Sequence, residues 1–140
     1  MTALYTTTAT ASAGRNGQVS TDDKKLVLDL SYPKEMGGTG EATNPEQLFA
    51  AGYSACFSNA ILHVAREANV KISSAPVSAE VGIGANKAGG FELSVSLAVT
   101  LDLPQDQAHE IVTKAHQVCP YSNAVRGNID IKLSVNGEAL

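Results

Sequence analysis

The two cysteines, Cys56 and Cys119, are the clearest candidates for chemistry in this sequence. A cysteine thiolate can attack an electrophile, bind a metal or form a disulfide. Residues 1–14 are rich in Thr, Ala and Ser and contain neither a basic region nor an apolar stretch of the kind found in secretory signals. We therefore expect a cytoplasmic protein whose cysteines are kept reduced and serve in redox chemistry, metal binding or packing.

The two cysteines are predicted to lie in different helical settings. Cys56 falls in the middle of an apolar helix, far from the helix N-terminus that commonly lowers a thiol pKa. Cys119 falls in the last turn of a second helix, where the negative end of the helix dipole disfavours a thiolate. Each can equally be a small buried apolar residue. If the two react together, Cys119 is the poorer attacking thiol and the better candidate for a resolving step.

Zinc is the metal that these cysteines suggest, because Cys56, His63, His116 and Cys119 offer four ligand atoms. On a straight helix the separation of Cys56 from His63 corresponds to a rise of about 10 Å. Ligands of one zinc ion lie about 2.0 to 2.3 Å from the metal, so this rise argues against a shared ion. It also argues against a hydrolase-type Cys-His pair. We expect no metal, and a structural role for His63.

Two charged residues outside the cysteine segments are further candidates. Arg15 lies in Gly14-Arg15-Asn16-Gly17, a strong hairpin-turn signal, where it can equally be a solvated cation. Glu46 follows Asn44 and Pro45 at a predicted helix start, where an acidic residue favours the positive end of the helix dipole. Sequence spacing places neither residue beside Cys56, so the residue types alone leave both roles open.

The elements that position these residues follow from apolar periodicity and turn signals. They give the order βββ-α-ββ-α-β, which indicates an α+β fold with antiparallel sheets and helices on one side, in a single domain over residues 1–140. The predicted strands are residues 4–8, the stretch after Gly17, 26–30, 76–83, 91–101 and 129–135; the predicted helices run from Asn44 to about Asn69 and from Pro104 to Cys119.

The first predicted helix is apolar on every side. Between Gln47 and Ala65 its only formal charge would be that of a protonated His63, yet its Gln, Ser and Asn residues would be costly in a membrane. One domain of this size does not easily surround such a helix, so we predict an intertwined homodimer with a long buried central helix. The net charge of -4, without a basic cluster, argues against nucleic acid and acidic membranes as partners.

Both cysteines lie within longer motifs, one from Ala42 to Tyr53 that runs into Ala55-Cys56-Phe57, and one from Val118 to Ala124. These motifs resemble those of the organic hydroperoxide resistance (Ohr) proteins of the OsmC/Ohr family. The resemblance extends over nearly the whole chain and includes the order and separation of the cysteines. It implies the OsmC/Ohr fold, in an intertwined dimer with two active sites at the subunit interface.

The resemblance also implies an activity, that of a thiol peroxidase reducing alkyl, aryl and fatty-acid hydroperoxides to alcohols. Cys56 would be the peroxidatic residue, Cys119 would resolve its sulfenic acid as a Cys56-Cys119 disulfide, and Arg15 and Glu46 would form a pair beside the thiol. It implies no bound cofactor, and an external dithiol reductant such as dihydrolipoamide or a lipoylated protein. The alternatives are an OsmC-type peroxidase of broader substrate use and a non-enzymatic thiol redox sensor.

Overall fold

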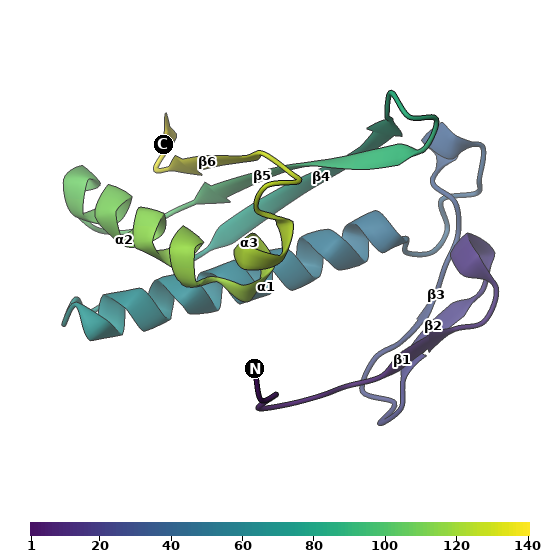
Figure 1. Cartoon of the computed structure of the whole chain (residues 1–140), viewed down its shortest axis with the longest axis horizontal. Helices are drawn as coiled ribbons and strands as arrows, with labels where there is room; N and C mark the ends of the chain where they lie inside the picture. Colours follow the sequence, from purple (N-terminus) through teal and green to yellow (C-terminus); the bar gives the residue numbers. More distant parts are fainter. The chain divides into compact units, whose positions relative to one another are not determined.

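The computed structural model describes residues 1–140 and divides the chain into two compact units, an N-terminal unit, Met1–Leu48, and a C-terminal unit, Phe49–Leu140. Figure 1 shows the elements in chain order, from β1 near the N-terminus to the strands at the C-terminus. The α+β class predicted from the sequence is confirmed, with two sheets and one long helix. That residues 1–140 act as a single domain stays a prediction.

The N-terminal unit contains a three-stranded antiparallel sheet in the order β1-β2-β3. A short 3-10 helix, Gly14–Asn16, joins the first two strands, and Gly14 has a left-handed φ of 58° that suits glycine at this turn. A second 3-10 helix follows the sheet. The strands are β1 (Ala9–Ala11), β2 (Gln18–Thr21) and β3 (Val27–Asp29), and the second 3-10 helix is Lys34–Met36.

The first strand begins later than predicted, at Ala9 instead of Leu4. Leu4 and Tyr5 are exposed, at 103% and 77%, whereas Ala9–Ala11 pairs with residues 19–21 of β2. The turn around Arg15 sets this pairing, and only the residues close to the turn find a partner strand. Within the β-branched run Thr6-Thr7-Thr8, only the Thr8 carbonyl oxygen accepts a backbone hydrogen bond, from the Asp22 N–H at 3.0 Å, so the strand propensity of the run does not produce a strand.

The long helix α1, Pro45–Glu67, begins as predicted. The Asn44 side-chain oxygen accepts a hydrogen bond from the Gln47 backbone N–H at 2.9 Å, and Pro45 occupies the first helical position. By length and composition α1 could cross a membrane, with a mean hydropathy of 1.3, but the core helix of a soluble protein passes the same test.

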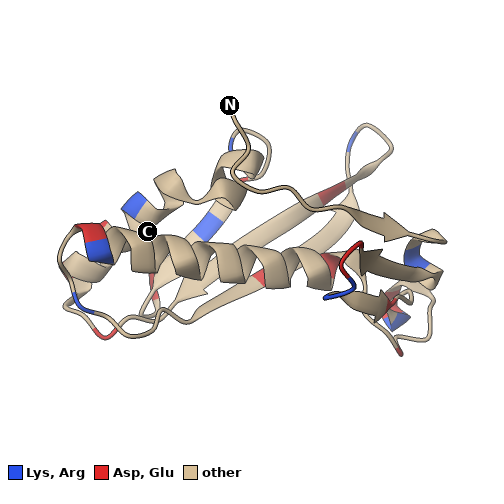
Figure 2. Ribbon diagram, turned by 90° about the horizontal axis from the view of Figure 1, so that it is seen from below, with Lys and Arg blue, Asp and Glu red and all other residues tan.

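Within one chain α1 is not buried on every side, and its predicted burial within a homodimer stays a prediction. One face packs into the core through residues such as Tyr53, Phe57 and Ile61. The other face leaves Ala51, Ala55, Asn59 and His63 exposed. Figure 2 shows α1 without coloured charges between its two ends. The apolar character of the helix therefore exceeds what this chain alone covers.

The C-terminal unit contains a four-stranded sheet in the order β4-β5-β6-β7, with helices α1 and α2 on one side (Figure 1). Its core joins α1 to β5 and α2 through residues such as Phe57, Leu97 and Val112. The elements are β4 (Val77–Ala85), β5 (Phe91–Val99), α2 (Gln105–Val118), α3 (Pro120–Val125), β6 (Ile131–Val135) and β7 (Glu138–Ala139).

One strand pair in this sheet corrects the antiparallel prediction, because β6 runs parallel to β5. A parallel partner requires a crossover connection, and α2 with α3 provides it. The sequence prediction contained the intervening helix but treated every pair as a hairpin. The short helix α3 and the edge strand β7 were not predicted.

Candidate active site

The two cysteines, 63 residues apart in sequence, meet in the C-terminal unit with their Sγ atoms 3.7 Å apart. Both are free thiols; Cys56 is half-buried and Cys119 has no exposed surface. A disulfide needs a separation of about 2.05 Å, so a shift of under about 2 Å would bond them. A reagent from solvent can approach Cys56, whereas Cys119 is shielded from direct attack.

The position of Cys119 follows from Pro120. A residue before proline is disfavoured in the helical region, and Cys119 has an extended backbone, with φ -62° and ψ 124°. It therefore ends α2 and begins α3, so the chain turns at the sulfur. The predicted place of Cys119 at the end of the second helix is confirmed. The helix dipole expected to disfavour its thiolate is that of α2, but Cys119 also stands at the start of α3.

The surroundings of Cys56 within one chain do not favour its thiolate. Burial raises the pKa of Cys56, the backbone N–H of Tyr121 lowers it by hydrogen bonding to the sulfur, and the neighbouring Cys119 raises it. No cation is among these influences. A thiolate at Cys56 would therefore have to be favoured by a group beyond these neighbours.

A chain of side-chain hydrogen bonds lies beside the two sulfurs. The Tyr53 hydroxyl is 2.9 Å from Ser122 Oγ, and Ser122 Oγ is 2.9 Å from His116 Nδ1. Tyr53 and Ser122 are fully buried. Burial and the charge of Arg126 lower the pKa of His116, which favours its neutral form. In the sequence, His116 is a candidate only as a zinc ligand, and no local pattern marks Ser122.

The N-terminal unit contains the second predicted pair, Arg15 and Glu46. Arg15 donates two hydrogen bonds to the Glu46 carboxylate, each 2.6 Å long, and the two side chains are 21% and 14% exposed. The guanidinium also lies 5.9 Å from the centre of the Tyr32 ring. Hydrogen bonding to Arg15 holds the pKa of Glu46 below its ordinary value, and Glu46 raises the pKa of Arg15. The pair is thus ionised and fixed in orientation.

This chain is similar in sequence to proteins of one known family. A family model described as OsmC-like protein matches residues 38–134. This chain belongs to the OsmC/Ohr family. It is 47% identical over 137 residues to the organic hydroperoxide resistance protein OhrB of Bacillus subtilis, covering 95% of this chain and 98% of that protein.

Solved structures give the same result. A Vibrio cholerae protein assigned as an organic hydroperoxide resistance protein, with captopril in one of its active sites, has a TM-score of 0.98 at 71% identity, covering 100% of this chain and 97% of its own. The crystal structure of Bacillus subtilis OhrB has a TM-score of 0.86 at 44% identity, covering 95% and 99%. These relatives support a role in peroxide detoxification and the oxidative stress response.

In this OsmC/Ohr-family chain, aromatic rings gather in the C-terminal unit near Cys56. The Tyr121 ring lies 5.7 Å from that of Tyr53 and 6.4 Å from that of Phe49, between ring centres. A side chain at Gly52 would meet the Tyr121 hydroxyl at 2.8 Å, so glycine lets the ring approach α1. Tyr121 itself is 39% exposed. The apolar surroundings expected for Cys56 are therefore largely aromatic and partly open.

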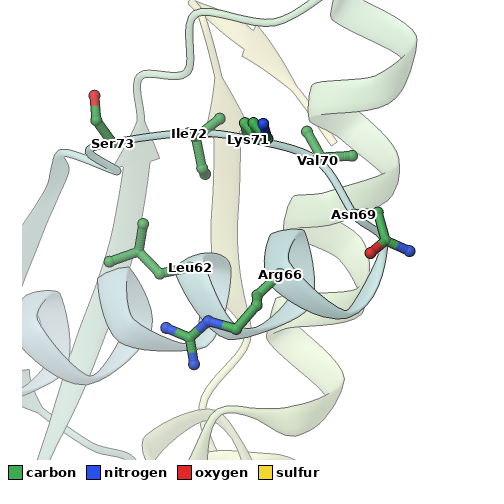
Figure 3. Close-up of a pocket in the computed structure, with 7 residues that line it drawn as sticks. All are labelled: Leu62, Arg66, Asn69, Val70, Lys71, Ile72 and Ser73. Carbon is green, nitrogen blue, oxygen red and sulfur yellow. The ribbon is translucent and has the colours of Figure 1, made fainter.

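A cavity of about 800 Å³ lies at the C-terminal end of α1 (Figure 3). Its lining combines apolar side chains with two cations, and none of the lining residues is a cysteine. The lining residues are Leu62, Arg66, Asn69, Val70, Lys71, Ile72 and Ser73. Neither Cys56 nor Cys119 therefore lines this cavity.

The structure contains no cluster of side chains that could serve as the zinc ligands considered from the sequence. No group of three or more His, Cys, Asp or Glu side chains is placed to hold a metal ion. His63 lies 3.5 Å from Glu67 on the surface of α1, and His116 contacts Ser122. The only sulfur-to-sulfur approach is that of Cys56 and Cys119.

Proposed function

We propose that this chain is a thiol-dependent peroxidase that reduces organic hydroperoxides to alcohols. The observation that carries the proposal is the half-buried Cys56 thiol held 3.7 Å from the buried Cys119 thiol, in a chain related to organic hydroperoxide resistance proteins. One thiol can be reached by a peroxide, and the other can be reached only by the first. That asymmetry is what a two-step thiol mechanism needs.

The proposed reaction has two chemical steps. The Cys56 thiolate attacks one oxygen of the hydroperoxide, forming an S–O bond and breaking the O–O bond, and the departing alkoxide takes a proton to become the alcohol. Cys119 then attacks the sulfur of the Cys56 sulfenic acid. The sulfenic hydroxyl leaves as water with the proton of Cys119, and a Cys56-Cys119 disulfide remains.

Arg15 is proposed to favour the Cys56 thiolate and to stabilise the departing alkoxide, while Glu46 holds the guanidinium in place. Two observations support this role. The pair is bidentate and largely shielded, and Cys56 lacks a cation among the groups that shift its pKa. Glu46 and Cys56 are separated along α1 by ten residues, or a rise of about 15 Å. We therefore propose that Arg15 acts on Cys56 of the partner subunit.

A homodimer is proposed as the working assembly. The N-terminal unit buries only Leu30 and Asn44, and α1 leaves Ala51, Ala55 and Asn59 exposed. A three-stranded sheet without a covered apolar face is unstable alone. The sheet of the N-terminal unit and the exposed face of α1 would therefore both be stabilised by packing against another surface. A second copy of the chain would provide it and would bring Arg15 to the cysteines. The related Vibrio cholerae protein has more than one active site.

The proposed reductant is an external dithiol, dihydrolipoamide or a lipoylated protein in the cytoplasm, with no bound cofactor. Because Cys119 is fully buried, reduction of the disulfide would begin at the half-buried Cys56 sulfur. A small dithiol on a flexible arm can reach such a sulfur more readily than a thiol fixed in a folded active site.

A turnover assay tests the proposal. With dihydrolipoamide in excess, a peroxidase consumes cumene hydroperoxide many-fold over the protein, whereas a thiol sensor stops after one equivalent. Comparable rates with hydrogen peroxide would favour the OsmC-type peroxidase of broader substrate use. Consumption limited to one equivalent would overturn the proposal of an enzyme.

A further inference from the structure

We propose that Ser122, hydrogen-bonded between Tyr53 and His116, is a positioning residue for the resolving step, because it holds Cys119 against Cys56. The inference rests on the proposed thiol chemistry and adds a group that the mechanism does not otherwise use. The hydroxyl of Ser122 has Tyr53 and His116 as its hydrogen-bond partners and acts through these two side chains.

The hydroxyl of Ser122 joins three helices at one point. Tyr53 comes from α1, His116 from the last turn of α2, and Ser122 from α3, with both bonds 2.9 Å long. Each member lies three residues from a cysteine in the sequence: Tyr53 precedes Cys56, while His116 and Ser122 flank Cys119. The same contact therefore fixes the helix that carries one sulfur and both helices that meet at the other.

Burial makes this contact specific. Ser122 and the hydroxyl-bearing Tyr53 are both fully buried, within a core that is mostly apolar. A buried hydroxyl without a hydrogen-bond partner is destabilising, so the Ser122 and Tyr53 hydroxyls are compatible with this core only while they stay paired. A displacement of α3 away from α1 would break the bond to Tyr53, and such displacements are disfavoured.

The backbone at Cys119 needs such a restraint. Cys119 lies at the turn between α2 and α3, where its extended backbone interrupts the helix. On the solvent-exposed side of this turn, Arg126 donates a hydrogen bond to the His116 carbonyl oxygen at 2.6 Å and also contacts Asn123. The Arg126 side chain itself is exposed to solvent. Ser122 provides the corresponding restraint on the inner side, next to the sulfurs.

The distance between the sulfurs decides how fast the disulfide forms. Cys119 has to approach the Cys56 sulfenic acid from 3.7 Å, and a wider or more variable separation lowers the fraction of productive encounters. Attack of peroxide on Cys56 does not involve Cys119. Loss of the Ser122 contact should therefore slow the second step and spare the first, and the longer-lived sulfenic acid should be oxidised further to sulfinic acid.

Ser122→Ala and Tyr53→Phe test this inference together. Rapid mixing with cumene hydroperoxide measures Cys56 oxidation, and dimedone trapping with mass spectrometry measures loss of the sulfenic acid. Loss of the buried hydrogen bonds should slow disulfide formation about fivefold in Ser122→Ala, and less in Tyr53→Phe, which keeps the bond between Ser122 and His116. Oxidation of Cys56 should stay within about twofold of wild type, and the sulfinic acid fraction should rise with peroxide.

Ser58→Ala is the matched control, because Ser58 also lies on α1 and loses its hydrogen bond to the Ala75 carbonyl oxygen, which is not a contact of either cysteine. It should lower the melting temperature and leave the ratio of resolving rate to oxidation rate unchanged. An equal slowing of disulfide formation in Ser58→Ala, or an unchanged ratio in Ser122→Ala, would overturn the inference. If Ser122→Ala does not fold, Tyr53→Phe decides with the same criteria.

Diamide separates this inference from the proposed function. It oxidises a thiol pair to a disulfide, being itself reduced to the hydrazine, and needs no peroxidase activity. The same slowing of disulfide closure is expected in both variants with diamide. A wild-type chain that ignores peroxide but closes the disulfide with diamide would contradict the peroxidase proposal alone. Unchanged closure with diamide in both variants would contradict the role of Ser122 alone.

Discussion

The two units of this chain position their reactive groups by different means. In the C-terminal unit, Cys56 and Cys119 are held by a continuous apolar core of two helices and a sheet. In the N-terminal unit, almost every residue is accessible to solvent, and the most shielded charges are those of Arg15 and Glu46. Packing places the thiols, whereas a bidentate ion pair places the charges.

This difference indicates which parts of the proposed site are complete within one chain. The two thiols have their geometry already, but the pKa of Cys56 is raised, which is unfavourable for attack. The ion pair has its orientation already, but it lies in a unit without a core of its own. The thiols should therefore be sensitive to local packing, and the ion pair to the association of subunits.

Cys56→Ser should have the largest effect, abolishing peroxide consumption. A serine hydroxyl is almost wholly protonated near neutral pH and cannot replace the thiolate. Peroxide consumption with dihydrolipoamide measures this, and Cys119→Ser is the control. Cys119→Ser should still oxidise at Cys56 once but form no intramolecular disulfide. Retained turnover in Cys56→Ser would remove Cys56 from the reaction.

Substrate choice should show the next largest effect, because the rings near Cys56 form an apolar and partly open surrounding. Each buried methylene contributes about 0.8 kcal/mol, so burial of three or four would gain roughly 2 to 3 kcal/mol, about a hundredfold in rate. Hydrogen peroxide has no such tail. Competition between cumene hydroperoxide and hydrogen peroxide for Cys56 measures the ratio, and equal rate constants would contradict an apolar site.

Arg15→Ala should slow Cys56 oxidation about ten- to a hundredfold, the loss expected for a charge-assisted contact of roughly 1.5 to 3 kcal/mol. The pKa of Cys56, which burial already raises, should rise further. Alkylation of Cys56 at a series of pH values measures this, with Arg66→Ala as a control cation from the end of α1. An unchanged pH profile in Arg15→Ala would exclude Arg15 from the site.

Mixed dimers sharpen the same comparison. Homodimers of Arg15→Ala and of Cys56→Ser should each lack full activity. A mixed dimer contains one Arg15→Ala subunit and one Cys56→Ser subunit. If Arg15 acts across the interface, one of its two sites has both a native Arg15 and a native Cys56. Random association would then restore about a quarter of the sites. If Arg15 acts on its own chain, mixing restores none of the lost activity, and the proposed crossing of subunits is wrong.

Local signals in the sequence predicted the elements best. Asn44-Pro45-Glu46 predicted the start of α1 because capping depends on neighbouring residues only, and the Asn44 cap is confirmed. Cys119 was predicted at the end of a helix because Pro120 cannot continue it. The pairing of Arg15 with Glu46 was implied by the family resemblance, since sequence spacing does not bring the two together.

Features that depend on tertiary contacts could not be predicted from these signals. The parallel alignment of β6 with β5 depends on the path of α2 and α3 across the sheet. The contact of Ser122 with Tyr53 and His116 depends on three helices meeting, and no local pattern marks it. The apolar pattern of α1 predicted burial on all sides, but it does not say which chain covers each face.

Glu46→Gln should have the smallest effect and a defined dependence on pH. The pKa of Glu46 is lowered from an ordinary value of 4.5 by hydrogen bonding to Arg15. A carboxylate whose pKa is lowered in the folded state contributes stability at pH values above its ordinary pKa, and that contribution is lost as the pH falls through the lowered pKa.

Partly exposed ion pairs contribute about 1 kcal/mol or less, so the melting temperature of Glu46→Gln should fall by only a few degrees at neutral pH. The difference from wild type should begin to shrink below pH 4.5, the ordinary value, and should be lost as the pH falls through the lowered pKa of Glu46 in the folded protein. Thermal unfolding of both proteins across this range measures it, with Glu110→Gln, in an exposed pair with Lys114 on α2, as the control. Because Glu46 orients Arg15, Glu46→Gln should also slow Cys56 oxidation less than Arg15→Ala does. A stability difference that persists at low pH would show that Glu46 contributes through packing and not through its charge.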